Sequence, residues 1–370
     1  MSIPAATSDS VTTSESATTS DPVSASEPKP SSEPLLQVRD LCVEFGAHVV
    51  LEDVNFDLYA GETLGLVGES GSGKSTLARA VLRLVRAARG TVVWRGLDLL
   101  SCDASQLRRR RRDLQIVFQD PLASLNPRMT IGDTIAEPLR IFEPGLNARA
   151  RGGRVGDMLE RVGLAADMIG RYPHEFSGGQ CQRVGIARAM ILAPKLLICD
   201  EPVSSLDVSI QGQIVNLLLD LQRDTGMSML FISHNLAVVR HLSHRILVMY
   251  SGKLVEIAAQ DALFAAPAHP YTQALLAAVP TANPARRTTR EAPASASLAT
   301  PTPALTLTPA FALRPALTMT PPLTTRAATG CSFRGRCVYA VPLCATAAPP
   351  LEEVIPGRWV ACHRAREFLR

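Results

Sequence analysis

One segment of the sequence has the residue types and spacing of a phosphate-binding loop. The apolar run 63–67 leads directly into Gly68-Glu69-Ser70-Gly71-Ser72-Gly73-Lys74-Ser75, and a helical pattern follows from Thr76 to Val85. In this Gly-x-x-x-x-Gly-Lys-Ser pattern, glycines let backbone N–H groups turn toward phosphates, and the helix N-terminus adds positive potential. The Lys74 ammonium can reach β and γ oxygens, and the Ser75 hydroxyl can bind Mg²⁺. The segment therefore predicts a binding site for a nucleoside triphosphate and Mg²⁺.

A second apolar run, 196–199, ends in two adjacent carboxylates, Asp200 and Glu201. Successive residues of a strand point to opposite faces of the sheet, so these two cannot play the same part. Beside the phosphate loop, Asp200 would hold Mg²⁺ through its water shell, and Glu201 would orient and polarise the attacking water. Taken alone, the pair is also compatible with a strand end in solvent. Together with the loop, it predicts hydrolysis of the triphosphate.

The elements that must position these segments alternate along the chain. From Leu35 to about Pro280, helical patterns alternate with short aliphatic or β-branched runs at 63–67, 115–118, 196–199, 229–233 and 246–250. This alternation is typical of an α/β domain with a mostly parallel sheet. We therefore expect the phosphate loop and the two carboxylates at the carboxyl edge of that sheet.

A glycine pair opens another predicted helix between the two halves of the site, in Phe176-Ser177-Gly178-Gly179-Gln180-Cys181-Gln182-Arg183. Its N-terminus can offer the Ser177 hydroxyl and the Gly179 N–H to an anion. Here the sequence resembles the ATP-binding cassette (ABC) ATPases, whose signature is Leu-Ser-Gly-Gly-Gln. The resemblance covers about residues 35–280. It implies a P-loop α/β fold with an antiparallel β subdomain and a helical subdomain at about 120–190.

The same resemblance implies how the second anion site is used. In the family, two such domains pair head to tail, and each signature closes over the nucleotide held by the other. Residues Ser177, Gly178, Gly179 and Gln180 are therefore expected to contact the ATP of a partner copy or a related subunit.

The remaining motifs of the family follow in order along the chain. Phe45 stands where family members place an aromatic ring against adenine, although a core phenylalanine is the alternative. Gln119 matches a glutamine that touches Mg²⁺ or water and faces the membrane partner, and His234 matches a histidine that contacts the γ-phosphate. The segment Ser204-Ser205-Leu206-Asp207 resembles a loop that crosses between the two ATPases.

These matches imply a complete set of site residues. The expected catalytic residues are Glu201, His234, Lys74 and Gln119, and the expected Mg²⁺ residues are Ser75, Gln119 and Asp200. The expected contacts to ATP add Phe45, Gly68, Glu69, Ser70, Gly71, Ser72, Gly73, Thr76, Asp207 and the signature residues.

Cys181 departs from the family pattern, which often has arginine or another polar residue after the signature glutamine. We expect this change to remove a cation from the neighbourhood of the phosphates and to slow turnover. On that basis the substitution Cys181→Arg should preserve or raise the ATPase activity.

Two segments are closely similar to the ATPase subunits of oligopeptide and dipeptide permeases, residues 117–129 and 199–211. His269-Pro270-Tyr271-Thr272-Gln273-Ala274-Leu275 agrees with a C-terminal element of that group. Nickel and glutathione importers share these motifs and stay open as alternatives. The resemblance implies a peripheral motor at the cytoplasmic face of the membrane. Its partners would be a second ABC ATPase, two transmembrane permease subunits and, indirectly, a solute-binding protein.

A soluble ABC ATPase acting on nucleic acid is the weaker alternative. Such proteins usually fuse two cassettes or carry long coiled-coil insertions, whereas this chain has one phosphate loop and neither insertion. The formal net charge of +4 is modest, and the run Arg108 to Arg112 is more typical of a solvated helix face than of a nucleic-acid surface. No nucleic-acid partner is therefore expected.

The sequence predicts no secretory signal and no membrane span. The N-terminus lacks a basic region followed by an apolar core. Residues 292–313 carry no charge, but four prolines interrupt them and Ala and Thr supply too little hydrophobicity. We therefore expect the chain in the reducing cytosol, where its eight cysteines are not paired as disulfides.

Composition divides the rest of the chain. The first 34 residues include 15 Ser or Thr and predict a disordered arm. Residues 281–329, mostly Ala, Thr and Pro, predict a linker, and 330–370 form a Cys-bearing segment.

The Cys-bearing segment contains four cysteines, Cys331, Cys337, Cys344 and Cys362. Their number suits an iron–sulfur cluster or zinc, but their spacing matches neither a zinc ribbon nor a ferredoxin motif. The resemblance to peptide-permease ATPases implies a [4Fe–4S] cluster, and packing without a metal stays open.

Overall fold

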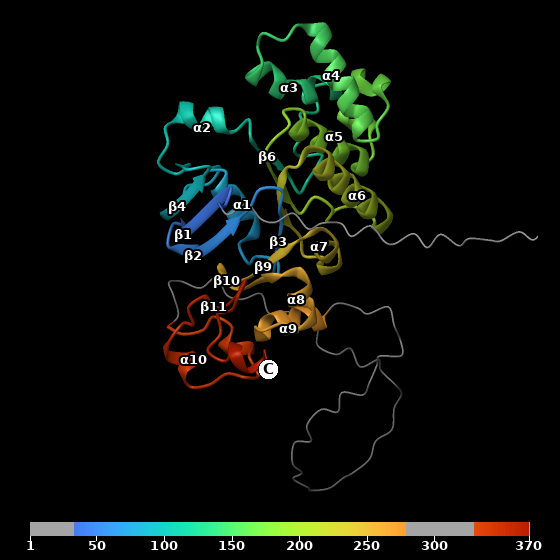
Figure 1. Ribbon diagram of the computed structural model, residues 1–370. Coiled ribbons are helices and arrows are strands. Elements are labelled where there is room, and N and C mark those ends of the chain that lie inside the picture. Colours follow the sequence, from blue (N-terminus) through green and yellow to red (C-terminus); the bar gives the residue numbers. More distant parts are fainter. Residues whose placement is uncertain (1–32, 279–328, 370) are drawn as a thin grey trace, which may run out of the picture.

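The computed structural model describes residues 33–278 and 329–369 (Figure 1). Nearly all of the arm expected over 1–34 and of the linker expected over 281–329 lies outside the described residues, as does the uncharged stretch 292–313. Within the described residues, no helix is long and apolar enough to cross a bilayer.

The larger of two sheets has the strand order β11-β12-β10-β9-β3-β8-β7-β6. Five neighbouring strands, which run from β9 to the edge strand β6, are parallel: β9 (Arg245–Tyr250), β3 (Thr63–Val67), β8 (Ser228–Ile232), β7 (Leu196–Asp200) and β6 (Leu114–Val117). Every residue of β3, β7 and β8 is buried, because helices cover both faces of the sheet. The carboxyl ends of these strands meet at one edge, where ligands bind in open α/β sheets.

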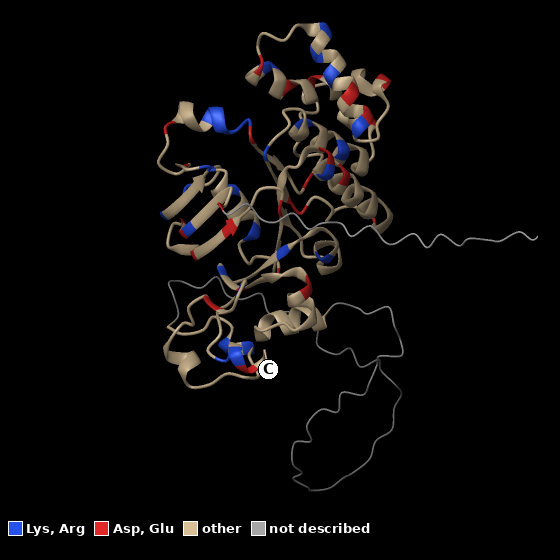
Figure 2. Ribbon diagram, in the orientation of Figure 1, with Lys and Arg blue, Asp and Glu red and all other residues tan. Residues whose placement is uncertain are grey.

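The smaller sheet is antiparallel, with the order β2-β1-β4-β5. Its strands are β1 (Leu36–Phe45), β2 (His48–Leu58), β4 (Arg89–Trp94) and β5 (Leu97–Asp98). Their apolar side chains form one core with helix α1 (Lys74–Val81), which starts two residues earlier than the sequence indicated. Helix α2 (Ala104–Arg110) follows, and its arginines are drawn in blue in Figure 2. Arg108, Arg109, Arg111 and Arg112 are exposed, as predicted for a solvated face.

A helical subdomain stands at the top of Figure 1. It contains α3 (Ile131–Phe142), α4 (Ala148–Arg161), the 3-10 turns η1 (Ala166–Gly170) and η2 (Pro173–Glu175), and α5 (Gly178–Met190). Buried side chains such as Ile135, Leu159 and Val184 join it to the main core. Helix α6 (Val208–Thr225) connects β7 to β8, and helix α7 (Leu236–Leu242) connects β8 to β9.

The C-terminal part of the chain adds strands β10 (Lys253–Ala259), β11 (Glu352–Ile355) and β12 (Arg358–Val360) to the large sheet. Its helices and 3-10 turns are α8 (Gln260–Ala265), α9 (Pro270–Ala277), η4 (Arg334–Arg336), α10 (Leu343–Thr346) and η5 (Ala365–Glu367). Strand β12 pairs with β10. The buried Arg358 guanidinium lies 2.7 Å from the fully buried Glu256 carboxylate of β10. The Cys-bearing segment is therefore fixed to the sheet by strand pairing and an internal ion pair.

Candidate functional site

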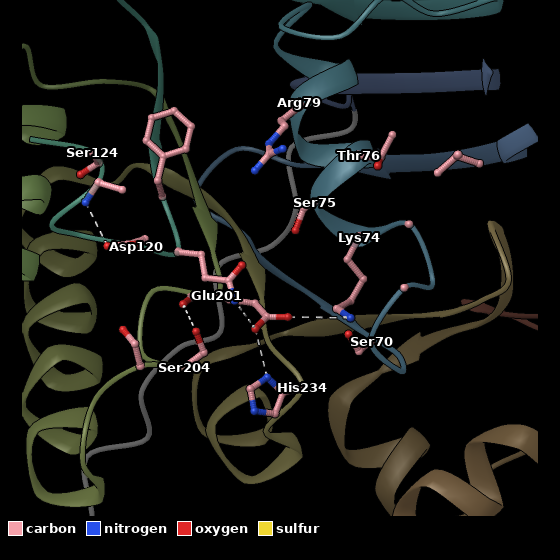
Figure 3. A pocket seen from close by; sticks show the side chains of 17 residues that line it. Ser70, Lys74, Ser75, Thr76, Arg79, Asp120, Ser124, Glu201, Ser204 and His234 are labelled. Carbon is pink, nitrogen blue, oxygen red and sulfur yellow. Dashed lines mark hydrogen bonds and ion pairs between the residues drawn. The ribbon is translucent and has the colours of Figure 1, made fainter. Parts of the chain in front are cut away.

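A cavity of about 1270 Å³ lies at the carboxyl ends of the parallel strands (Figure 3). Four loops line it: the one before α1 and those after β6, β7 and β8. The lining residues are Val50, Ser70, Gly71, Gly73, Lys74, Ser75, Thr76, Arg79, Phe118, Gln119, Asp120, Ala123, Ser124, Glu201, Ser204, Ser205 and His234. The structure thus brings most of the predicted phosphate loop together with Gln119, Glu201 and His234.

The phosphate loop has a backbone that its glycines make possible. Gly71 and Gly73 have φ of +78° and +103°, in the region that favours glycine. The Lys74 ammonium donates hydrogen bonds to the carbonyl oxygens of Gly68 and Glu69, at 3.0 and 2.9 Å. Burial lowers the pKa of Lys74, although the neighbouring carboxylates, above all Glu201, act against this. The ammonium therefore links the end of the phosphate loop to its first two residues.

The predicted Mg²⁺ residues meet between α1 and β7. The Ser75 hydroxyl donates a 2.7 Å hydrogen bond to Asp200 Oδ1, and Asp200 is fully buried. Its Oδ2 has no hydrogen-bond partner among the described residues, and the nearest cation recorded is Arg79, at 3.9 Å. Burial raises the pKa of Asp200. A hydroxyl and a carboxylate with a spare oxygen are donors that suit Mg²⁺, so the residues fit the ion.

Glu201 lies among the other predicted catalytic residues (Figure 3). Its Oε2 is 3.1 Å from His234 Nδ1 and 3.4 Å from Gln119 Nε2, and its Oε1 is 3.9 Å from Lys74 Nζ. Its φ is +48°, a left-handed conformation that is costly for a residue other than glycine. Asp200 and Glu201 therefore face different groups, as their adjacent positions predicted.

The signature residues do not line this cavity. Ser177 is exposed at the N-terminus of α5, where its hydroxyl accepts a hydrogen bond from the Gln180 N–H at 3.3 Å. Gln180 Oε1 accepts one from the Ser177 N–H in return. At Gly179, an added Cβ would lie 2.7 Å from Ile210 Cγ2, so the signature packs against the start of α6. Asp207 caps that helix by accepting from the Ile210 N–H.

Several other predicted contact residues also lie outside the cavity lining. Phe45 is 51% exposed at the end of β1, and Gly68, Glu69, Ser72 and the buried Asp200 are not among the lining residues. The sequence interpretation missed Arg79 and Ser124, which do line the cavity. Arg79 could have been found, because it stands four residues after Ser75 and so on the same face of α1.

The expectation that the side chain at position 181 lies near the phosphates is wrong. The Cys181 side chain is fully buried in the core of the helical subdomain, and its thiol points to the Pro173 carbonyl oxygen at 3.5 Å. Position 181 therefore faces away from solvent and from any phosphate at the helix N-terminus. A thiol fits there because cysteine packs as a small apolar residue.

The four C-terminal cysteines come together. Cys331, Cys337, Cys344 and Cys362 line one small cavity of about 10 Å³, and all four are free thiols. Burial raises the pKa of Cys331 and raises that of Cys362 to about 11. The cavity is close to the size that one water needs, and no group of three or more metal-ligating side chains in 33–278 and 329–369 is arranged to hold an ion. Four thiols are a suitable donor set for an iron–sulfur cluster, but the cavity between them is too small to hold one.

Comparison with known families agrees with this geometry. The model of the ABC transporter family matches residues 51–204, and that of the oligopeptide/dipeptide transporter C-terminal region matches 255–304 and 304–344. The oligopeptide transport ATP-binding protein OppF of Salmonella typhimurium is 52% identical over 82% of this chain and 84% of its own. OppF of Escherichia coli is 51% identical over 82% and 84%.

Solved structures show the same fold. The dimeric ATP-binding cassette MJ0796, bound to ADP and Pi, superposes with a TM-score of 0.57 at 27% identity over 61% of this chain and 98% of its own. The cbiO1 protein of Clostridium perfringens gives 0.57 at 25% identity over 63% and 91%. The predicted ABC ATPase fold is confirmed. The chain therefore belongs to the ABC transporter ATPases, in the group of the oligopeptide transport ATP-binding proteins.

Proposed function

We propose that this chain hydrolyses ATP to drive an importer for peptides. The observation that carries the proposal is the position of Glu201, whose carboxylate lies within 4 Å of His234, Gln119 and Lys74 at the end of the phosphate loop. Hydrolysis needs a base or water-orienting group beside positioned positive charge, and this constellation supplies both. The names of the relatives, oligopeptide transport ATP-binding proteins, support peptides as the solute.

The chain's own residues would act on ATP and Mg²⁺ as follows. The loop N–H groups from Ser70 to Thr76 and the Lys74 ammonium bind the phosphates, and Ser75 and Asp200 hold the ion, with Gln119 beside it. Mg²⁺ neutralises charge on the phosphates when it is bound. Glu201 Oε2 orients the attacking water and accepts its proton, while His234 and Gln119 fix the carboxylate.

A second copy or a related ATPase would complete the pocket. Ser177, Gly178, Gly179 and Gln180 form a helix N-terminus that lies outside the chain's own cavity, and such an end binds anions. The dimeric form of the related cassette supports the pairing. Phe45 is exposed and so free to stack on adenine, and Asp207 stands at the start of α6 beside the signature.

Outside the ATPase pair, we assign two transmembrane permease subunits and an indirect solute-binding protein. The chain then acts as a peripheral protein at the cytoplasmic face of the membrane. In this assignment residues 35–280 form the motor, and 330–370 form an appended segment that a linker over 281–329 connects to it.

Reconstitution tests the proposed function. The chain is expressed with permease subunits and a solute-binding protein of the oligopeptide type and is placed in proteoliposomes. Tri- to pentapeptides should stimulate ATP hydrolysis and enter the vesicles. Stimulation by nickel or glutathione alone would assign the solute to the alternatives. Hydrolysis that responds to single-stranded nucleic acid, without any association with permease, would overturn the transport function.

The four C-terminal cysteines also belong to this proposal, as ligands of a [4Fe–4S] cluster. Their meeting in one cavity supports it, although the cavity of about 10 Å³ would have to widen to hold a cluster. Anaerobically purified protein should contain iron and absorb in the visible sulfur-to-iron band. Zinc without iron would assign a zinc site instead, and protein free of both metals would leave four packed thiols.

A further inference from the structure

The Cys-bearing segment contacts the phosphate loop directly. Arg336 Nη1 and Nη2 donate to the two carboxylate oxygens of Glu69, at 2.9 and 2.8 Å. Glu69 is the second residue of the loop and lies 267 positions earlier in the chain. This pair of parallel hydrogen bonds is the strongest arrangement that arginine and a carboxylate form. The segment therefore does more than cover the edge of the sheet.

A second contact fixes the backbone of the same residue. The Glu69 N–H donates to Tyr271 Oη at 2.9 Å, and the Glu69 carbonyl accepts from the Lys74 ammonium at 2.9 Å. Tyr271 is buried in α9, within the His-Pro-Tyr motif, to which the sequence interpretation gave no role. The N–H, carbonyl and carboxylate of Glu69 are thus all held, and two of them are held by C-terminal elements.

An aromatic platform places Arg336. Its guanidinium carbon lies 5.7 Å from the ring centres of both Tyr250 and Phe333. Tyr250, Tyr271 and Phe333 pack against each other with ring centres 4.7 to 5.5 Å apart. A planar guanidinium can lie against aromatic rings while it pairs with a carboxylate, and lysine cannot do both in this way.

The charge of Glu69 explains why the contact matters. A carboxylate in a loop that binds three phosphates would repel them if it pointed into the cavity. Glu69 does not line the cavity, and Arg336 both pairs with the carboxylate and neutralises it. With the N–H of Glu69 also held, the following N–H groups keep their direction toward the phosphates.

We propose that Arg336 and Tyr271 are positioning residues for ATP binding, so that the C-terminal segment is part of the nucleotide site. The inference rests on the proposed ATP site. Both residues act through Glu69 and do not touch the nucleotide. Their loss should weaken binding, while the hydrolytic step at Glu201 continues at nearly its normal rate.

Nucleotide titration tests this inference in the full-length chain. Arg336→Gln should raise the Kd for a fluorescent ATP analogue and the KM for ATP about two- to fivefold, the range for loss of one exposed ion pair. The value of kcat should stay within about twofold. Arg336→Lys keeps the charge but not the paired geometry, so its Kd should lie between those of the unaltered chain and Arg336→Gln. Tyr271→Phe removes only the hydroxyl and should also raise Kd.

A double-mutant cycle and a matched control separate positioning from loss of structure. Glu69→Gln and Arg336→Gln should not add, because each breaks the same pair. Arg364→Gln removes an ion pair that stays inside the segment, with Glu367, and should leave Kd unchanged. An unchanged Kd in Arg336→Gln, or an equal rise in Arg364→Gln, would overturn the inference. Failure of the unaltered chain to bind ATP would instead overturn the proposed function.

Discussion

Glu201 shows at the scale of one residue how the fold prepares chemistry. Its neighbour Asp200 continues the buried strand and meets Ser75, whereas Glu201 leaves the strand with a φ of +48°. That conformation costs about 1–3 kcal/mol for a residue other than glycine. The cost is offset by the surrounding core, which the buried strands β7 and β8 supply. The strained turn places the carboxylate beside His234 and Gln119.

Glu201→Gln should lower kcat by roughly 10²-fold or more, because an amide cannot accept the proton of the attacking water. ATP binding should persist, since the phosphate loop remains intact. Phosphate release and nucleotide titration measure the two effects. Glu160→Gln, at an exposed position of α4, is the control and should behave as the unaltered protein. Near-normal turnover in Glu201→Gln would remove Glu201 from the catalytic role.

Cys181→Arg should destabilise the protein by about 3–5 kcal/mol, because the position is fully buried and a charged guanidinium there would lose its hydration. Urea unfolding measures the loss. Cys181→Ala removes only a sulfur atom and should cost about 1 kcal/mol. If Cys181→Arg unfolds at the same urea concentration as the unaltered chain, the side chain must reach solvent.

The turn before α9 shows how one element depends on a single protonation state. His269 is buried, and its Nδ1 accepts the Tyr271 N–H at 3.0 Å as the cap of the helix. Glu256 accepts the N–H groups of Ala268 and His269. Burial lowers the pKa of His269 to about 4, and a protonated Nδ1 could no longer accept a hydrogen bond.

Stability should therefore fall as the pH drops from about 6.5 to 4. In that range the unfolded chain binds a proton on His269 that the folded chain excludes, and protonation favours unfolding by up to about 3 kcal/mol. His269→Asn keeps an acceptor for the cap but does not titrate. Urea unfolding at pH 7 and pH 4 should show a smaller loss in this variant than in the unaltered chain. Equal losses would show that His269 is not the group that titrates.

At the scale of the whole molecule, the proposed function uses two separate surfaces of the chain. Its own phosphate loop lines the cavity, and the N-terminus of α5 stands outside it. One monomer cannot apply both to a single nucleotide. The head-to-tail pair proposed above would apply both surfaces to each nucleotide.

ATP-dependent dimers should form when Glu201→Gln stops hydrolysis. Adding Ser177→Asp should abolish them, because the new carboxylate would face the partner's triphosphate while it still caps α5. Ser177→Asn caps the helix without charge and should keep the dimer, which makes it the matched control. Size-exclusion chromatography with light scattering measures the mass. Dimers of normal stability with Ser177→Asp would place the signature away from the nucleotide.

The parts of the site that depend on local spacing could be predicted from the sequence. The phosphate loop and the pair Asp200 and Glu201 could be predicted because each follows a strand and depends on a few neighbouring residues, whereas His234 was expected only from the resemblance to the ABC ATPases. The parallel order of the central strands also followed from the alternation of patterns. Local backbone geometry fixes such features before any distant contact forms.

Tertiary packing alone decided the rest. The side-chain direction of Cys181 depends on which face of α5 meets the helical subdomain, and the addition of β11 and β12 to the sheet depends on pairing with β10. The contact of Arg336 with Glu69 joins residues 267 positions apart. No local pattern encodes such a contact, because it exists only when the aromatic platform and the sheet bring the two ends of the domain together.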